Sequence, residues 1–160
     1  MGPSLEFVLD ASRRLNLVTG DNGLGKSFLL EVAWWSLTGN WAQDVIHPMA
    51  GHYSPTPSII FQITGDMSIS RDVVAEYDWL TPQEDNWVLK SQRYTTAGIV
   101  VYAQIDGSIA VYDPLETDFR ETVLVPRRMV FSREDIWHGR HIEVRGQNRA
   151  LINGMLDDLL

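Results

Sequence analysis

One glycine-rich stretch constrains this chain more than any other feature. Residues 20–27 read GDNGLGKS and fit the pattern G-x-x-x-x-G-K-[ST]. The apolar run LNLVT at 15–19 is typical of a strand, and the run KSFLLEVAWWSL at 26–37 contains helix formers without proline or glycine. We therefore expect a strand, a tight glycine loop and a helix in succession, which is the context that the pattern requires.

The residue types in this loop suit the binding of a phosphate chain. Glycines let the backbone curl so that successive N–H groups point at phosphate oxygens, and the following helix adds the positive end of its dipole. Lys26 would bridge the β- and γ-phosphates and is the expected catalytic residue, while the Ser27 hydroxyl would bind Mg²⁺. The alternative is a plain glycine turn with an exposed lysine. The expected nucleotide-binding residues are Gly20, Asp21, Asn22, Gly23, Leu24, Gly25, Lys26, Ser27 and Phe28.

The predicted helix at 26–37 is apolar nearly all round. Its apolar side chains form one stripe and also cover much of the remaining surface. We therefore expect burial on more than one side, with only Glu31 and Ser36 facing outward.

The middle of the chain has the pattern of antiparallel β-structure. Two β-hairpins are predicted, at 58–71 and 98–113, because alternating runs flank Gly65-Asp66 in the first and Asp106-Gly107 in the second. The second pair is the favoured one for a type I′ turn. A shorter strand is expected at 87–89.

Beyond the second hairpin we expect three further elements. The run Met-Val-Phe at 129–131 predicts a short strand, and Ser132 with Asp135 three residues later indicates a helix N-terminus. The stretch 148–160 has the spacing of a short amphipathic helix, broken near Gly154.

Charge is distributed unevenly along the chain. The net charge of −8 argues against a generally basic nucleic-acid binder. Residues 1–126 carry −9, whereas residues 127–149 carry +3 because six arginines lie there among three acidic residues. We interpret the arginine-rich stretch at 127–149 as a solvated face that pairs with the acidic surface elsewhere. The alternative is that this stretch contacts DNA, phosphate or a partner.

Length and composition favour one folded domain over residues 1–160. The chain has no cysteine, which excludes a disulfide framework and a thiolate metal site. No stretch approaches about 18 uninterrupted apolar residues, and no secretion signal is visible at the N-terminus. A cytoplasmic protein without a membrane partner is the expectation.

The form G-x-N-G-x-G-K-S, with LNLVTG before it and FLLEVAWWSLTG after it, resembles the N-terminal nucleotide-binding segment of ABC-type ATPases of the RecF, SMC and related AAA-like family. The resemblance is sharp over about residues 5–40 and architectural beyond them. It implies an α/β fold, in which a partial three-layer P-loop core lies beside an antiparallel β-subdomain. It also implies ATP and Mg²⁺ as ligands, hydrolysis at a composite site in a homodimer or with a partner ATPase chain, and work that is usually done on DNA.

The later motifs of that family have no complete copy in this sequence. These are an LSGGQ-like signature, a Walker B strand that ends in Asp-Glu, and a downstream histidine. Asp113 ends an apolar run and is a candidate Mg²⁺ ligand, but Pro114 follows it where the family has a catalytic glutamate. A turn residue at the end of a strand is the alternative for Asp113. Gln147 has no motif around it that would mark it as the family's metal-coordinating glutamine.

Together these patterns predict a P-loop strand and helix at about 15–38 and an antiparallel β insertion at about 58–113. The predicted function is binding of ATP and Mg²⁺, with hydrolysis dependent on Walker B and signature elements that this sequence lacks. A complete small NTPase or kinase that uses Asp113 for the metal is one alternative. A non-catalytic module that binds a protein partner is the other.

Overall fold

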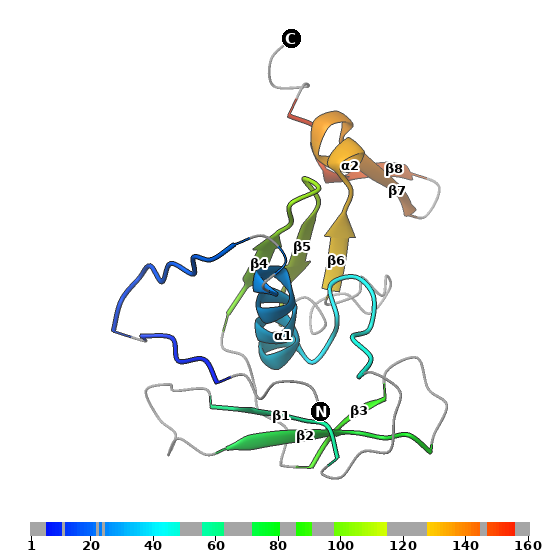
Figure 1. Cartoon of the computed structure of the whole chain (residues 1–160). Helices are drawn as coiled ribbons and strands as arrows, with labels where there is room; N and C mark the ends of the chain where they lie inside the picture. Colours follow the sequence, from blue (N-terminus) through cyan, green and yellow to red (C-terminus); the bar gives the residue numbers. More distant parts are fainter. Residues whose placement is uncertain are drawn as a thin grey trace. The chain divides into compact units, whose positions relative to one another are not determined.

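The computed structural model describes residues 6–10, 12–21, 23, 25–48, 56–62, 72–80, 86–90, 98–114, 128–144 and 147–155 of the chain (Figure 1). Within these ranges the elements, in chain order, are α1 (Lys26–Thr38), β1 (Ser58–Phe61), β2 (Val73–Tyr77), β3 (Trp87–Leu89), β4 (Val100–Ala103), β5 (Ile109–Tyr112), β6 (Arg128–Phe131), α2 (Arg133–His138), β7 (Arg140–Val144) and β8 (Gln147–Ile152).

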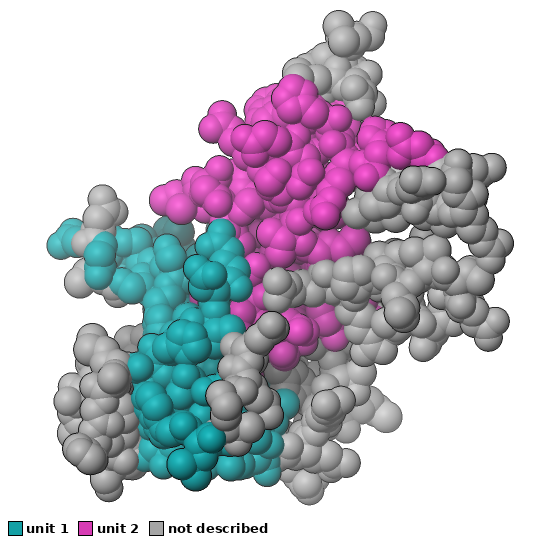
Figure 2. All heavy atoms as spheres, turned by 90° about the vertical axis from the view of Figure 1, so that its right-hand side faces the viewer, with its two compact units in different colours: residues 1–30, 43–95 teal, residues 31–42, 96–160 magenta. Residues whose placement is uncertain are grey.

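The chain divides into two compact units (Figure 2). The first consists of residues 1–30 and 43–95, and the second of residues 31–42 and 96–160. Helix α1 runs from the first unit into the second, because the division falls between Leu30 and Glu31. Both units are therefore discontinuous in sequence.

Every strand pair in the described part of the chain is antiparallel, which corrects the expected fold class. The strands form sheets in the orders β1-β2-β3, β4-β5-β6 and β7-β8. A P-loop core needs a buried parallel sheet with helices on both faces. The predicted three-layer α/β core is wrong, since the described part of the chain is mostly antiparallel β with two short helices.

The run at 15–19 shows the physical reason for this error. A strand needs a neighbour to satisfy its backbone N–H and C=O groups, and this run belongs to no sheet among the described residues. Leu15 and Leu17 are 80% and 82% exposed. The apolar pattern favours a strand, but none of the described strands lies beside this run as a parallel partner.

In the first unit, β1, β2 and β3 form one antiparallel sheet. Strand β1 pairs with β2 in the register Phe61↔Val73, and the predicted partner segment at 67–71 lies outside the described residues. Strands β1 and β3 were predicted from the sequence, whereas β2 was not. Residues Val73, Ala75 and Tyr77 of β2 alternate as its buried face.

In the second unit, β4, β5 and β6 form the other three-stranded sheet. The predicted hairpin is confirmed, because β4 pairs with β5. Its turn is not the expected two-residue Asp106-Gly107 turn: Ala103 pairs with Ile109, and the N–H of Gly107 donates to the carbonyl oxygen of Gln104 at 3.1 Å, which gives a three-residue loop at 105–107. The φ of Gly107 is 88°, a left-handed value that favours glycine. The predicted strand at 129–131 is also confirmed, as part of β6.

Helix α1 packs its second half into the core of the second unit. Trp34 joins Ala42, Ala110 and Tyr112 in one buried cluster. The expected burial is only partly right: Trp34 and Trp35 are 2% exposed, whereas Phe28 and Leu30 near the start are 47% and 51% exposed. Ser36, which was expected to face outward, is buried, and Glu31 is half-buried.

The end of the described chain is a hairpin where a helix was predicted. Strand β8 pairs with β7, so residues 148–152 of the predicted helix are extended. The prediction is wrong because cross-strand pairing outweighs a helical spacing over so short a run. Helix α2 does begin after Ser132, as predicted.

No helix in the described part of the chain combines the length and apolar character that crossing a membrane requires.

Candidate functional site

The loop before α1 has the backbone curvature that the glycine pattern predicts. The φ angles of Gly23 and Gly25 are 85° and 79°, both in the left-handed region. No heavy atom lies within 4 Å of a Cβ built on Gly23, so backbone conformation rather than space requires glycine there. Asn22 and Leu24 lie outside the described residues.

Helix α1 starts directly from this loop. The N–H of Leu29 donates to the carbonyl oxygen of Gly25 at 3.0 Å, which closes the first helical turn. The first turn holds no acidic residue, so no carboxylate within that turn faces the positive end of the helix dipole. Ser27 lies in this turn with its side chain exposed, and Phe28 follows it.

Lys26 folds back over its own loop. Its Nζ donates to the carbonyl oxygen of Gly20 at 2.8 Å and to that of Asp21 at 2.6 Å. These contacts join residues five and six positions apart and hold the ammonium beside the loop backbone. Gly20 and Asp21 are exposed and Lys26 is half-buried.

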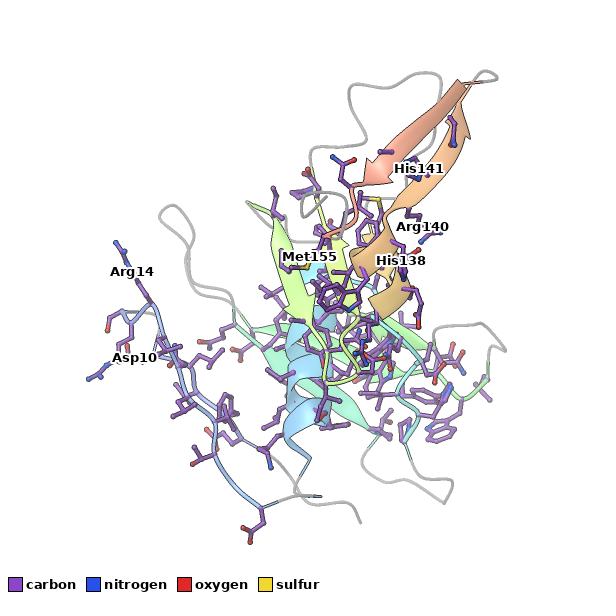
Figure 3. All side chains as sticks on the ribbon, turned by 90° about the horizontal axis from the view of Figure 1, so that it is seen from above. Asp10, Arg14, His138, Arg140, His141 and Met155 are labelled. Carbon is purple, nitrogen blue, oxygen red and sulfur yellow. The ribbon has the colours of Figure 1, made fainter. Side chains whose placement is uncertain are left out.

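An ordered turn stands before the run at 15–19 (Figure 3). The carboxylate of Asp10 accepts from the backbone N–H and the hydroxyl of Ser12 at 3.0 and 2.6 Å, and from Nε of Arg13 at 3.0 Å. Asn16 closes the turn because its Oδ1 accepts from the N–H of Asp10 at 2.9 Å. The hydrogen bond from the Ser12 hydroxyl is the largest cause of a lowered Asp10 pKa, ahead of those from its N–H and from Arg13. This turn was not predicted, although an Asp followed two residues later by a Ser is a signal for it.

Asp113 follows β5, the central strand of an antiparallel sheet. A Walker B strand instead lies parallel to the P-loop strand, so this placement favours a turn residue at the end of a strand. Asp113 belongs to the second compact unit, whereas the loop at 20–27 belongs to the first. Gln147 is the first residue of β8.

Metal-ligating side chains do not gather in the described regions. Among those residues, no group of three or more histidine, aspartate or glutamate side chains is placed to hold a metal ion. A metal at the loop would therefore depend on the Ser27 hydroxyl and on oxygens of a bound phosphate chain, which is a set that suits Mg²⁺.

The first unit also contains an aromatic cluster that was not predicted from the sequence. Tyr77 lies at its centre, with ring centroids 4.6 Å from Trp79 and 5.3 Å from Trp87. Its hydroxyl lies 2.7 Å from Nδ1 of His47, and Nε1 of Trp87 donates to the carbonyl oxygen of Ile46 at 2.7 Å. These contacts fasten the segment after α1 to the sheet β1-β2-β3.

The groups around Lys26 fit a phosphate chain. The ammonium group of Lys26 and the hydroxyl group of Ser27 both lie in the first turn of α1, directly after glycines with left-handed φ angles. Comparisons with protein-family models, with curated proteins and with solved structures find no match to this chain.

Proposed function

We propose that this chain binds ATP with Mg²⁺ through the loop at 20–27 and the first turn of α1. The observation that carries the proposal is the position of Lys26, whose ammonium rests on the carbonyl oxygens of Gly20 and Asp21. A cation held over a glycine loop, at the start of a helix without acid in its first turn, is an arrangement for binding phosphate.

Each residue of the loop has a separate role in this proposal. Lys26 exchanges its contacts with the loop carbonyls for contacts with β- and γ-phosphate oxygens. Ser27 offers its hydroxyl to Mg²⁺, which when bound offsets the negative charge of the phosphates. The backbone N–H groups of Gly23 and Gly25 would donate to phosphate oxygens, and Phe28 lies in the adjoining first turn.

The family that we propose, from the residue pattern around 20–27 and not from the fold, is the ABC-type ATPase family, with this chain as an N-terminal segment located in the cytoplasm. Little or no hydrolysis is expected from the chain alone, because its sequence lacks the Walker B and signature elements. A homodimer or a partner ATPase chain would supply a second nucleotide-bound head. Action on DNA rests on the resemblance only.

Calorimetric titration of Mg·ATP into the wild type and a Lys26→Ala variant tests this function. We expect the variant to bind at least about ten-fold more weakly, because it loses charge-assisted hydrogen bonds worth about 1.5–3 kcal/mol. The chain's other lysine provides the control, since Lys90 instead pairs with Glu76 at 3.5 Å. Lys90→Ala should leave the affinity unchanged, and a phosphate-release assay should stay near background for all three proteins.

A folded wild type that binds no Mg·ATP would sink the proposal. The alternative is then a module that binds a protein partner, and the exposed Leu15 and Leu17 favour it. If the chain is such a module, neither lysine variant should show any binding of Mg·ATP in the titration.

A further inference from the structure

A carboxylate lies inside the loop that holds Lys26. Asp21 is the one acidic residue between Gly20 and Leu30, and it is exposed. Its backbone oxygen lies 2.6 Å from Nζ of Lys26. Covalent geometry keeps a carboxylate within about 5 Å of the carbonyl oxygen of the same residue, so this negative charge stays within about 8 Å of Nζ.

A phosphate chain that binds Lys26 must therefore approach this negative charge. The Debye length is about 8 Å at 0.15 M salt, so the repulsion is only partly screened. Metal-free ATP carries about four negative charges at neutral pH, and its Mg²⁺ complex carries about two. The carboxylate thus opposes the metal-free form about twice as strongly.

We propose that Asp21 makes this loop selective for the metal-complexed nucleotide over the metal-free nucleotide. The inference rests on the proposed function, and it assigns Asp21 a role that the glycine and lysine pattern does not give it. Asp21 acts here through charge alone, because its contact with Lys26 is made by its backbone oxygen.

The Asp21→Asn substitution isolates this charge. Asparagine has nearly the same size and keeps the backbone oxygen that accepts from Lys26. Coulomb's law with screening gives a gain in affinity of about two-fold for Mg·ATP and about four-fold for metal-free ATP at 0.15 M salt. Near 0.02 M salt the gains rise to about three-fold and about ten-fold.

The experiment is calorimetric titration of the wild type and of Asp21→Asn, with Mg·ATP and with ATP in excess EDTA, at both salt concentrations. We expect Asp21→Asn to gain more affinity for metal-free ATP than for Mg·ATP, and this difference to shrink as salt increases. Asp44→Asn removes an exposed carboxylate of the same unit outside the loop, and it should leave the ratio of the two affinities unchanged.

Two results would overturn the inference while the proposed function stands. Equal gains for both forms would show that Asp21 does not discriminate between them. A selective loss of Mg·ATP affinity in Asp21→Asn would make Asp21 a residue that serves the metal. Absence of binding by the wild type and by Asp21→Asn would overturn the proposed function together with this inference.

Discussion

At the scale of single residues, Gly154 and Gly139 bring two stretches of backbone close together. A Cβ built on Gly154 would lie 2.6 Å from the backbone N of Gly139, 2.6 Å from the carbonyl carbon of His138 and 2.7 Å from the oxygen of Trp137. These are backbone atoms, so they cannot rotate away. Glycine at 154 lets the end of β8 cross the end of α2.

We expect Gly154→Ala to lower the free energy of unfolding by about 1–3 kcal/mol, because overpacking forces the two backbones apart. Urea denaturation measures the change. Gly98→Ala is a matched control, since nothing lies within 4 Å of its Cβ. A Gly154→Ala variant as stable as Gly98→Ala would show that α2 and β8 do not cross so closely in solution.

The turn at Asp10 predicts a local pH dependence. The folded pKa of Asp10 is lowered from its ordinary value of 3.8, first by the hydrogen bond from the Ser12 hydroxyl. Because the folded pKa is lowered, the ionised carboxylate of Asp10 stabilises the turn fully above pH 3.8. This stabilisation is lost as the pH falls below 3.8 and through the folded pKa, where the carboxylate becomes protonated. NMR titration of the Ser12 amide should show the turn opening below pH 3.8. If the amide shift followed the ordinary pKa, the turn would not be formed in solution.

At the scale of elements, α2 depends on its first residues. The N–H of Asp135 donates to Oγ of Ser132 at 3.1 Å, and Oδ2 of Asp135 accepts from the N–H of Ser132 at 2.8 Å. This reciprocal pair is a capping box, and the helix that it starts spans only Arg133–His138. A helix so short has little stability without its cap.

Ser132→Ala should therefore destabilise the protein by about 1 kcal/mol, because the N–H of Asp135 loses its acceptor. Ser132→Thr keeps a hydroxyl at the same position and should recover most of this loss. Urea denaturation of the two variants gives the comparison. Equal stabilities for alanine and threonine would mean that the cap contributes nothing.

Elements that local chemistry specifies were the predictable ones. The Asp106-Gly107 pair and the Ser132–Asp135 spacing act within a few residues, so the hairpin and the start of α2 follow from sequence. Strand β2 and strand β8 depend on partners that the sequence does not reveal. The helical spacing at 148–160 therefore led to a wrong prediction of a helix.

The candidate site, too, was predictable only in the features that local sequence specifies. The curvature at Gly23 and Gly25 and the start of α1 at Lys26 follow from the glycine-rich pattern. The contacts of Lys26 with Gly20 and Asp21 do not, because a pattern fixes residue types and not the partners of a side chain. Parallel neighbours for residues 15–19 were inferred from resemblance, and the observed sheets are antiparallel.

At the scale of the whole molecule, stability should depend on the buried cluster and not on the apolar run before the loop. Trp34→Ala should cost about 3–5 kcal/mol, because it removes a large side chain from the cluster with Ala110 and Tyr112. Leu17→Ala should stay within about 0.5 kcal/mol, since Leu17 is exposed. Thermal and urea unfolding provide both values. A cost above about 2 kcal/mol for Leu17→Ala would show that this run is buried in solution.

Because helix α1 is shared between the two compact units, this protein cannot be cut into independent halves at a single peptide bond. A fragment that starts at residue 96 would retain Ala110 and Tyr112 but lose Trp34 and Ala42, which complete their buried cluster. The complementary fragment would keep the glycine loop and leave Trp34 without those partners. Each fragment expressed alone should therefore fold poorly. Mixing the two fragments should restore structure only when Trp34 of α1 packs again against Ala110 and Tyr112.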